Sequence, residues 1–199
     1  MDKLAHTDHP IHGLLARRWS PRAFADRPVE LTTLGSLFEA ARWSASCFNE
    51  QPWRFIIARR EDPDAYQRLL DCLTEGNQTW ARHAPVLALG VAKRTFSEID
   101  KPNAHARHDL GIATAQLMIQ ATALGLYVHA MAGILPDKAR ERYRVPEDFD
   151  VVTALAVGYL GDAAALPEAL RDRELAPRQR RPLTELAFTD AWGNPAPFA

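Results

Sequence analysis

The sequence contains little cysteine and no long apolar run, and both absences exclude classes of protein. Its 199 residues include two cysteines, Cys47 and Cys72, without the spacing of a disulfide framework or a metal site. No apolar stretch reaches the roughly 18 residues of a membrane span, and no hydrophobic signal region follows the polar start Met1-Asp2-Lys3. We therefore expect a soluble, cytoplasmic protein with no membrane partner.

The sequence also lacks an excess of either acidic or basic residues. The 25 acidic and 24 basic residues nearly cancel, so the overall charge gives no reason to expect a nucleic-acid partner. With 47% apolar and 25% charged residues, the chain has enough material for one well-buried globular domain. We expect a single domain over residues 1–199, with an extended arm from about 162 to 199.

Apolar patterning predicts helices and strands that alternate along the chain. Helical spacing over 31–41 predicts a helix, with Thr32 or Thr33 as its cap. A second helix is predicted over 103–124, and because most of its circumference is apolar it belongs in a core or a dimer seam. Apolar runs of strand length cover 53–58, 85–91, 127–135 and 151–160.

The chain after Gly161 differs from the rest in composition and in patterning. It is rich in arginine and proline and has no long periodic element. It nevertheless keeps large apolar side chains at Leu183, Leu186, Phe188, Trp192 and Phe198. Because a free linker would be less apolar, we expect this arm to pack along its own domain or along a partner subunit.

Two polar motifs are the strongest functional signals. Arg18, Ser20 and Arg22 stand at alternate positions, so in an extended segment their side chains point the same way and can converge on an anion. About thirty residues later, 44–55 forms a loop of small and amide residues. Pro52-Trp53 closes that loop, because proline cannot continue the preceding helix.

Five short motifs in a fixed order point to a family. They are Arg-x-Ser-x-Arg at 18–22, Ser-x-x-Asn-x-Gln-Pro-Trp at 46–53, Leu-Gly-Leu at 124–126, Gly-Tyr-Leu-Gly at 158–161 and Arg-Arg-Pro-Leu at 180–183. From about residue 12 to 193 the chain resembles the FMN-dependent nitroreductase family. The resemblance implies an α+β fold, with a mostly antiparallel sheet flanked by helices and a long core or dimer helix. It also implies a homodimer with FMN at the interface and a C-terminal arm swapped onto the partner subunit.

The resemblance further implies which residues bind FMN. Arg18 and Ser20 would hold the phosphate and Arg22 would lie nearer the ring, where a guanidinium favours the reduced flavin anion. The full set of cofactor-binding residues is Arg18, Trp19, Ser20, Arg22, Ala45, Ser46, Cys47, Asn49, Met131, Ala132, Gly133, Arg180 and Arg181. The chain departs from the family pattern at three of these, Trp19, Ala45 and Cys47.

The activity implied is that of an NAD(P)H oxidoreductase. FMN would take hydride from NADH or NADPH at its N5 atom and reduce nitroaromatics, quinones or similar planar acceptors in a ping-pong sequence, with no catalytic side chain required. The donor stays open, because the chain has no Gly-x-Gly-x-x-Gly fingerprint. Alternatives are an enoate or azo reductase, a dehalogenase, a flavin-destructing oxygenase, a non-catalytic flavin carrier or a flavin-free interaction module.

Each motif also has a plainer interpretation. Arginine pairs are usually solvated surface, and Ser46 and Asn49 fit a helix end and a turn. Cys47 has no His or second Cys beside it in the sequence to make it a catalytic thiol. The histidines at 6, 9, 12, 105 and 108 do not predict a metal site, because their spacing supplies too few converging ligands.

Aromatic residues mark a possible substrate lid. Phe48, Trp80 and Phe96 are the candidates, and the last two lie in the segment 77–103. A lid there would cover a planar acceptor stacked on the flavin.

Overall fold

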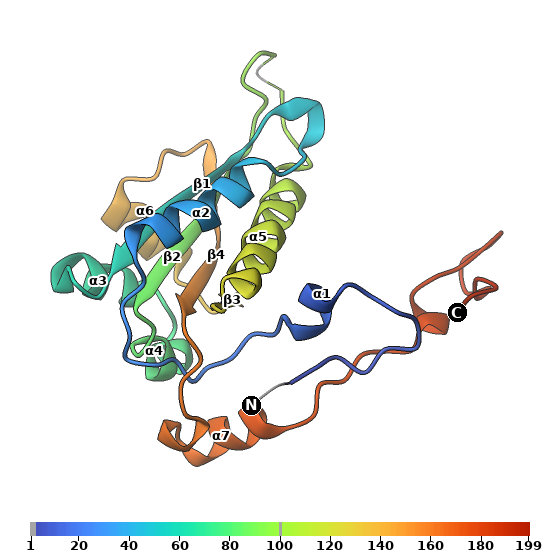
Figure 1. Ribbon diagram of the computed structural model, residues 1–199. Helices are drawn as coiled ribbons and strands as arrows, with labels where there is room; N and C mark the ends of the chain where they lie inside the picture. Colours follow the sequence, from blue (N-terminus) through green and yellow to red (C-terminus); the bar gives the residue numbers. More distant parts are fainter. Residues whose placement is uncertain (1–2, 100) are drawn as a thin grey trace.

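The computed structural model describes residues 3–99 and 101–199, and within them a sheet of four strands lies at the centre (Figure 1). The strands are β1 (Trp53–Arg59), β2 (Val86–Lys93), β3 (Tyr127–Met131) and β4 (Phe149–Gly158). Their order is β1-β2-β4-β3, and every neighbouring pair is antiparallel. The apolar runs in the sequence thus predicted the strands, and the α+β class that the resemblance implies is confirmed.

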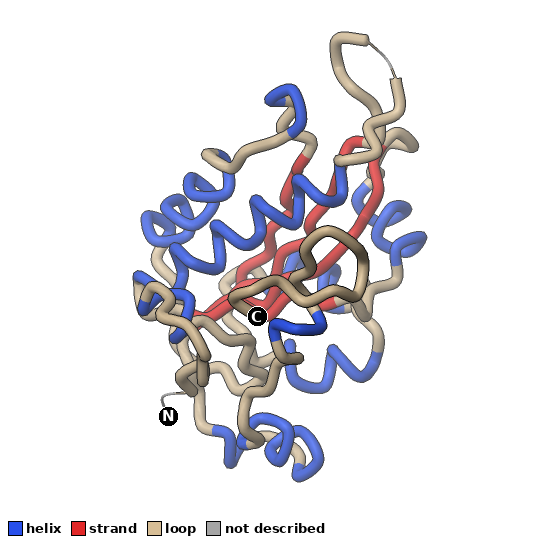
Figure 2. The backbone as a smooth tube through the Cα atoms, turned by 90° about the vertical axis from the view of Figure 1, so that its right-hand side faces the viewer, coloured by secondary structure: helices blue, strands red, loops and turns tan. Residues whose placement is uncertain are grey.

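The middle of the sheet consists of β2 and β4, as the nearly continuous apolar runs predicted. Every residue of β2 from Val86 to Ala92 is buried, because helices cover both faces of the sheet. Figure 2 shows helices on both sides of the strands.

One face of the sheet is covered by α2 (Leu31–Arg42) and α5 (Ala106–Ala123). Leu37 and Leu110 from these helices pack into one apolar cluster with Leu155 of β4. The predicted caps Thr32 and Thr33 are wrong, because α2 already begins at Leu31 and no side chain caps it. Gly125 follows the last turn of α5 with a φ of 74°, the left-handed conformation that glycine adopts at helix ends.

The other face is covered by α3 (Pro63–Leu70), α4 (Glu75–Ala81) and α6 (Pro136–Tyr143). The buried aromatic side chains of this second cluster are Phe24, Tyr66 and Trp80, and the cluster includes Leu87, Leu89 and Ala154 of the sheet. Helices α3 and α4 were not predicted from the sequence.

The two ends of the chain run beside each other, away from the sheet (Figure 1). The N-terminal segment contains α1 (Gly13–Arg17), and the C-terminal arm contains α7 (Glu168–Leu175) with 3-10 turns at Ala163–Ala165 and Leu183–Glu185. Arg178 joins them by donating to the carbonyls of Lys3 and Ala16, each at 2.7 Å. The C-terminal segment thus includes a short helix that the sequence did not reveal.

The arms expose large apolar side chains to solvent. These are Leu4, Ile11, Leu15, Leu175, Leu186, Trp192 and Phe198, with Trp192 92% exposed. Among the described residues, no helix combines the length and apolarity needed to cross a membrane.

Candidate functional site

A cavity of about 300 Å³ lies between the N-terminal segment and the C-terminal arm. Its cationic lining residues are Lys3, Arg18, Arg22, Arg173, Arg178 and Arg180. Burial, followed by the charges of Arg178 and Arg180, lowers the pKa of Arg18. Cations gathered in this way repel one another, so the cavity is suited to a multiply charged anion.

Most of the predicted phosphate ligands converge on this cavity. Ser20 and Trp19 line it together with the arginines, and Arg18 Nη1 donates to Ser20 Oγ at 3.4 Å. Arg181 points elsewhere and pairs with Glu185 at 3.2 Å. Arg178, which sequence reasoning did not select, lines the cavity in addition to Arg180.

Among the described residues that line the cavity, Glu174 carries the one carboxylate. Its side chain accepts the N–H of Arg22 at 2.9 and 3.0 Å and the N–H of Ala23 at 3.1 Å. Glu174 is 3% exposed. Six cationic side chains against this one carboxylate leave the cavity with an excess of positive charge.

The same backbone segment is held from the sheet by His129 of β3. The Nδ1 atom of His129 lies 2.8 Å from the carbonyl oxygen of Pro21, and its ring lies 4.5 Å from that of Trp80. Because a carbonyl only accepts, Nδ1 carries the proton. Burial lowers the pKa of His129 to about 4, so its ring is neutral at pH 7.

The segment Met131–Gly133 is fixed by its carbonyl groups. Thr153 Oγ1 donates to Met131 at 3.0 Å, and the carbonyl of Gly133 accepts the N–H of Thr74 and Asn77 Nδ2, both at 3.0 Å. A Cβ atom on Gly133 would stand 2.5 Å from Asn77 Nδ2, so only glycine fits. Ala132 stays exposed at the surface.

The second motif forms a strained loop. Phe48, Asn49 and Gln51 have φ angles of 52°, 55° and 51°, a left-handed conformation that costs about 1 kcal/mol or more for each non-glycine residue. The hydroxyl of Ser46 accepts the N–H of Gln51 at 3.0 Å, and Asp109 accepts the N–H of Cys47 at 3.0 Å. Strain held in place by such contacts is typical of functional loops.

Asp109 has a structural role in this loop. It is 2% exposed, and its second oxygen meets His108 Nδ1 at 3.0 Å. Within residues 3–99 and 101–199, no three His, Cys, Asp or Glu side chains gather as a metal site requires.

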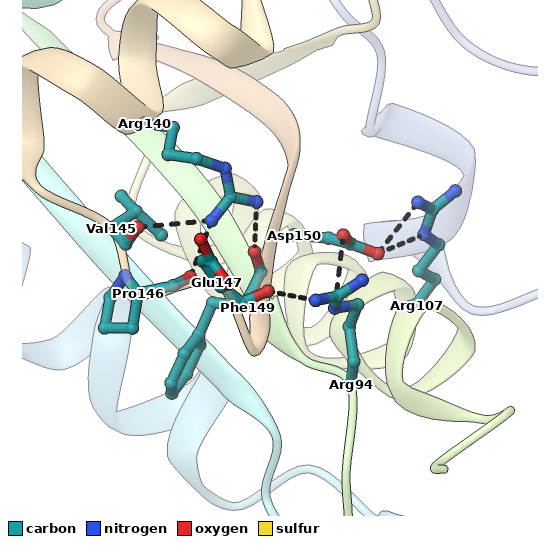
Figure 3. A network of polar contacts seen from close by, with 8 residues as sticks. All are labelled: Arg94, Arg107, Arg140, Val145, Pro146, Glu147, Phe149 and Asp150. Carbon is teal, nitrogen blue, oxygen red and sulfur yellow. Dashed lines mark hydrogen bonds and ion pairs between the residues drawn. The ribbon is translucent and has the colours of Figure 1, made fainter.

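A network of arginines fixes the same end of the sheet (Figure 3). Arg94, which follows β2, and Arg107 of α5 both reach Asp150, at 3.9 and 2.8 Å. Arg140 donates to the carbonyls of Val145, Pro146 and Phe149. The start of β4 is thus tied to the helix that carries Asp109.

An aromatic pocket of about 410 Å³ opens beside the strained loop. Phe48, 88% exposed, meets Phe96 edge-on with ring centroids 5.8 Å apart. Glu50 joins the two loops by accepting the N–H of Ser97 at 3.0 Å. Trp80, the third aromatic candidate, is buried in the core against Phe24 and His129.

The two predicted motifs lie at opposite ends of the sheet in one chain (Figure 1). The loop with Cys47 precedes the start of β1, whereas Phe24, which follows the first motif, bridges to Leu160 after the end of β4. Seven residues of β1 separate these ends, a span of about 20 Å. One chain therefore presents the two halves of the predicted site apart from each other.

Comparison with known proteins confirms the resemblance to the family. The model of the nitroreductase family matches residues 15–159, and the chain belongs to this family. The arm with Glu174, Arg178 and Arg180 lies beyond the matched segment.

Individual relatives extend this comparison. An uncharacterised 15.4 kDa protein of Mycolicibacterium smegmatis is 35% identical over 149 residues, which are 71% of this chain and 99% of that protein. A Streptomyces coelicolor protein described as a candidate NADH dehydrogenase/NAD(P)H nitroreductase is 26% identical over 162 residues, covering 69% of this chain and 76% of that one. A crystal structure of an oxidoreductase containing FMN is 36% identical, with a TM-score of 0.90 over 95% of this chain and 96% of that one.

Proposed function

We propose that this protein is an FMN-dependent NAD(P)H oxidoreductase. The observation that carries the proposal is the basic cavity, where six cationic side chains face one carboxylate, that of Glu174, among the described lining residues. The cavity fits a phosphate monoester, the anionic group of FMN. The similar structure that contains FMN covers almost the whole chain, arm included, and supports the same cofactor.

The chain's own residues would hold the cofactor at three places. Arg18, Ser20, Arg178 and Arg180 would bind the phosphate, as charge-assisted donors. Arg22 would stand nearer the ring, and the segment Met131–Gly133 would orient it through the exposed backbone at Ala132. When bound, FMN supplies the redox chemistry, taking hydride at N5 from NADH or NADPH and passing electrons to a nitroaromatic, quinone or similar planar acceptor in a ping-pong sequence.

We also propose that the working unit is a homodimer of single-domain subunits. One chain keeps its Ala45–Asn49 loop at the far end of the sheet from its basic cavity, so the loop of a partner subunit would complete each site. The exposed apolar side chains of the arm, above all Trp192, support a swapped contact with that partner.

The test begins with an absorbance spectrum of the purified protein. A flavin band that bleaches on anaerobic addition of NADPH or NADH is the expected result. A colourless protein whose melting temperature does not rise with excess FMN would overturn the proposal, because a ligand of the native state must stabilise it. Light scattering after size-exclusion chromatography would test the dimer, with twice the chain mass expected.

A further inference from the structure

Glu174 is an unusual anchor for a helix. It is the buried residue of α7, whereas its neighbour Leu175 is 44% exposed. A surface helix normally packs through apolar side chains. Leu170 of α7 packs against the apolar cluster of Tyr66 and Trp80, but the fully buried side chain of the helix is a carboxylate, so a polar contact contributes to its docking.

The contacts of Glu174 explain how a buried carboxylate is tolerated. Burying a charge is costly unless hydrogen bonds replace its water. The two oxygens accept the consecutive backbone N–H groups of Arg22 and Ala23 at 2.9 to 3.1 Å. Lys3 Nζ donates to the backbone carbonyl of the same glutamate.

Three consecutive residues at the end of the first motif, Pro21, Arg22 and Ala23, are held by side chains from two different elements. His129, from the sheet, binds the carbonyl of Pro21. Glu174, from the arm, binds the next two N–H groups, of Arg22 and Ala23. The geometry of the phosphate ligands that surround this segment therefore depends on where α7 is docked.

The arm also delivers ligands of its own. Arg178 and Arg180 follow Glu174 by four and six residues and line the same cavity as Arg18. The contact at Glu174, together with the bonds from Arg178 to the carbonyls of Lys3 and Ala16, thus sets the arginines of the arm against those of the first motif.

We propose that Glu174 is a positioning residue for the flavin phosphate. By docking α7 on the backbone of Arg22 and Ala23, it brings arginines from both ends of the chain around one phosphate group. The proposal rests on the proposed FMN function. It concerns a residue outside the segment that the family model matches.

A positioning role differs from a merely structural one in what it predicts for two ligands. General loosening of the fold would weaken the binding of FMN and of riboflavin alike. Displaced phosphate ligands would weaken FMN alone, because riboflavin carries the same ring without the phosphate. The ratio of the two dissociation constants therefore separates the two roles.

The experiment uses Glu174→Gln, which keeps the shape of the side chain and replaces one acceptor oxygen by an NH2 group. Glu168→Gln on the same helix, with a side chain 84% exposed, is the matched control. Kd values of the apoprotein for FMN and for riboflavin are measured by flavin fluorescence. We expect Glu174→Gln to weaken FMN binding about tenfold or more, the effect of losing one charged hydrogen bond. The Kd for riboflavin should change by less than about twofold.

Two results would overturn the inference: equal losses for both flavins, or FMN affinity equal to that of Glu168→Gln. If Glu174→Gln does not fold, Glu174→Asp replaces it, since a retained but shortened carboxylate should fold and still lower the preference for FMN. A wild-type ratio in a folded Glu174→Asp would overturn the inference as well. A wild-type chain that binds neither flavin would instead contradict the proposed function itself.

Discussion

The carboxylate of Asp109 accepts the backbone N–H of Cys47 at 3.0 Å, and this contact joins the first turn of α5 to the strained loop before β1. The loop holds three non-glycine residues in the left-handed conformation. Asp109 therefore balances part of that strain with a charge-assisted hydrogen bond from a buried position.

Asp109→Ala should destabilise the protein by about 2 kcal/mol or more, because the N–H of Cys47 loses its acceptor and the buried site loses volume. Urea unfolding followed by circular dichroism measures the effect. Asp64→Ala is the control, since Asp64 occupies the first turn of α3 in an exposed position. Equal stability of the two variants would show that Asp109 does not support the loop.

Gly133→Ala should destabilise the protein by about 1 to 3 kcal/mol, because the new Cβ must displace Asn77 and Thr74. A Cβ there would lie 2.5 Å from Asn77 Nδ2 and 2.6 Å from Thr74 Oγ1. Gly35→Ala in α2 has no heavy atom within 4 Å of its Cβ and should instead stabilise the helix by up to about 1 kcal/mol. Melting temperatures of both variants test the contrast, and a Gly133→Ala protein as stable as wild type would contradict it.

His129 should make stability depend on pH. The pKa of His129 in the folded protein is about 4, below its usual value of 6.5, so between these values the unfolded chain binds more protons than the native one. The contribution is fully present above pH 6.5 and is lost as the pH falls toward 4. It amounts to at most about 3 kcal/mol.

The measurement compares wild type with His129→Gln, which keeps a donor for the carbonyl of Pro21. Free energies of unfolding at pH 7 and pH 4.5 should show that wild type loses more stability than the variant. Parallel losses would mean that the protonation of His129 is not coupled to folding.

The substitutions Arg18→Ala and Arg22→Ala should affect different properties of the bound flavin. Removing Arg18 should raise the Kd for FMN about tenfold or more, because the phosphate loses a charge-assisted donor. Removing Arg22 should leave much of the FMN bound but lower its reduction potential, because a guanidinium near the ring favours the reduced anion.

Fluorescence titration and a dye-coupled redox titration measure these effects. Arg17→Ala, at an exposed position next to Arg18, should match wild type in both. An unshifted potential in Arg22→Ala would refute its assignment near the ring.

The sequence predicted the parts of the fold whose signal is local. The buried strands β2 and β4 are continuous apolar runs, and α5 has a long apolar repeat that ends at Gly125. Helices α3 and α4 are short and rich in polar residues, so the apolar pattern did not reveal them. Asp62 before Pro63 was an available signal for α3, since Asp62 caps that helix at 3.1 Å.

The resemblance supplied candidate residues for the site, whereas the long-range contacts that position them were missed. The partners of Asp109 and Glu174 are main-chain N–H groups 62 and 152 positions away in sequence. A backbone amide has no residue type of its own, so no motif identifies such a partner. For the same reason, Glu174 looks like any other acidic residue in an arginine-rich segment.

The interlocked ends of the chain also have a consequence for biosynthesis. The sheet needs nothing beyond Gly158, and its strands can pair as soon as that residue has left the ribosome. The basic cavity needs both Lys3 and Arg180, which lie 177 positions apart in the sequence. A chain emerging from the ribosome can therefore pair its strands well before all the residues that line this cavity are present.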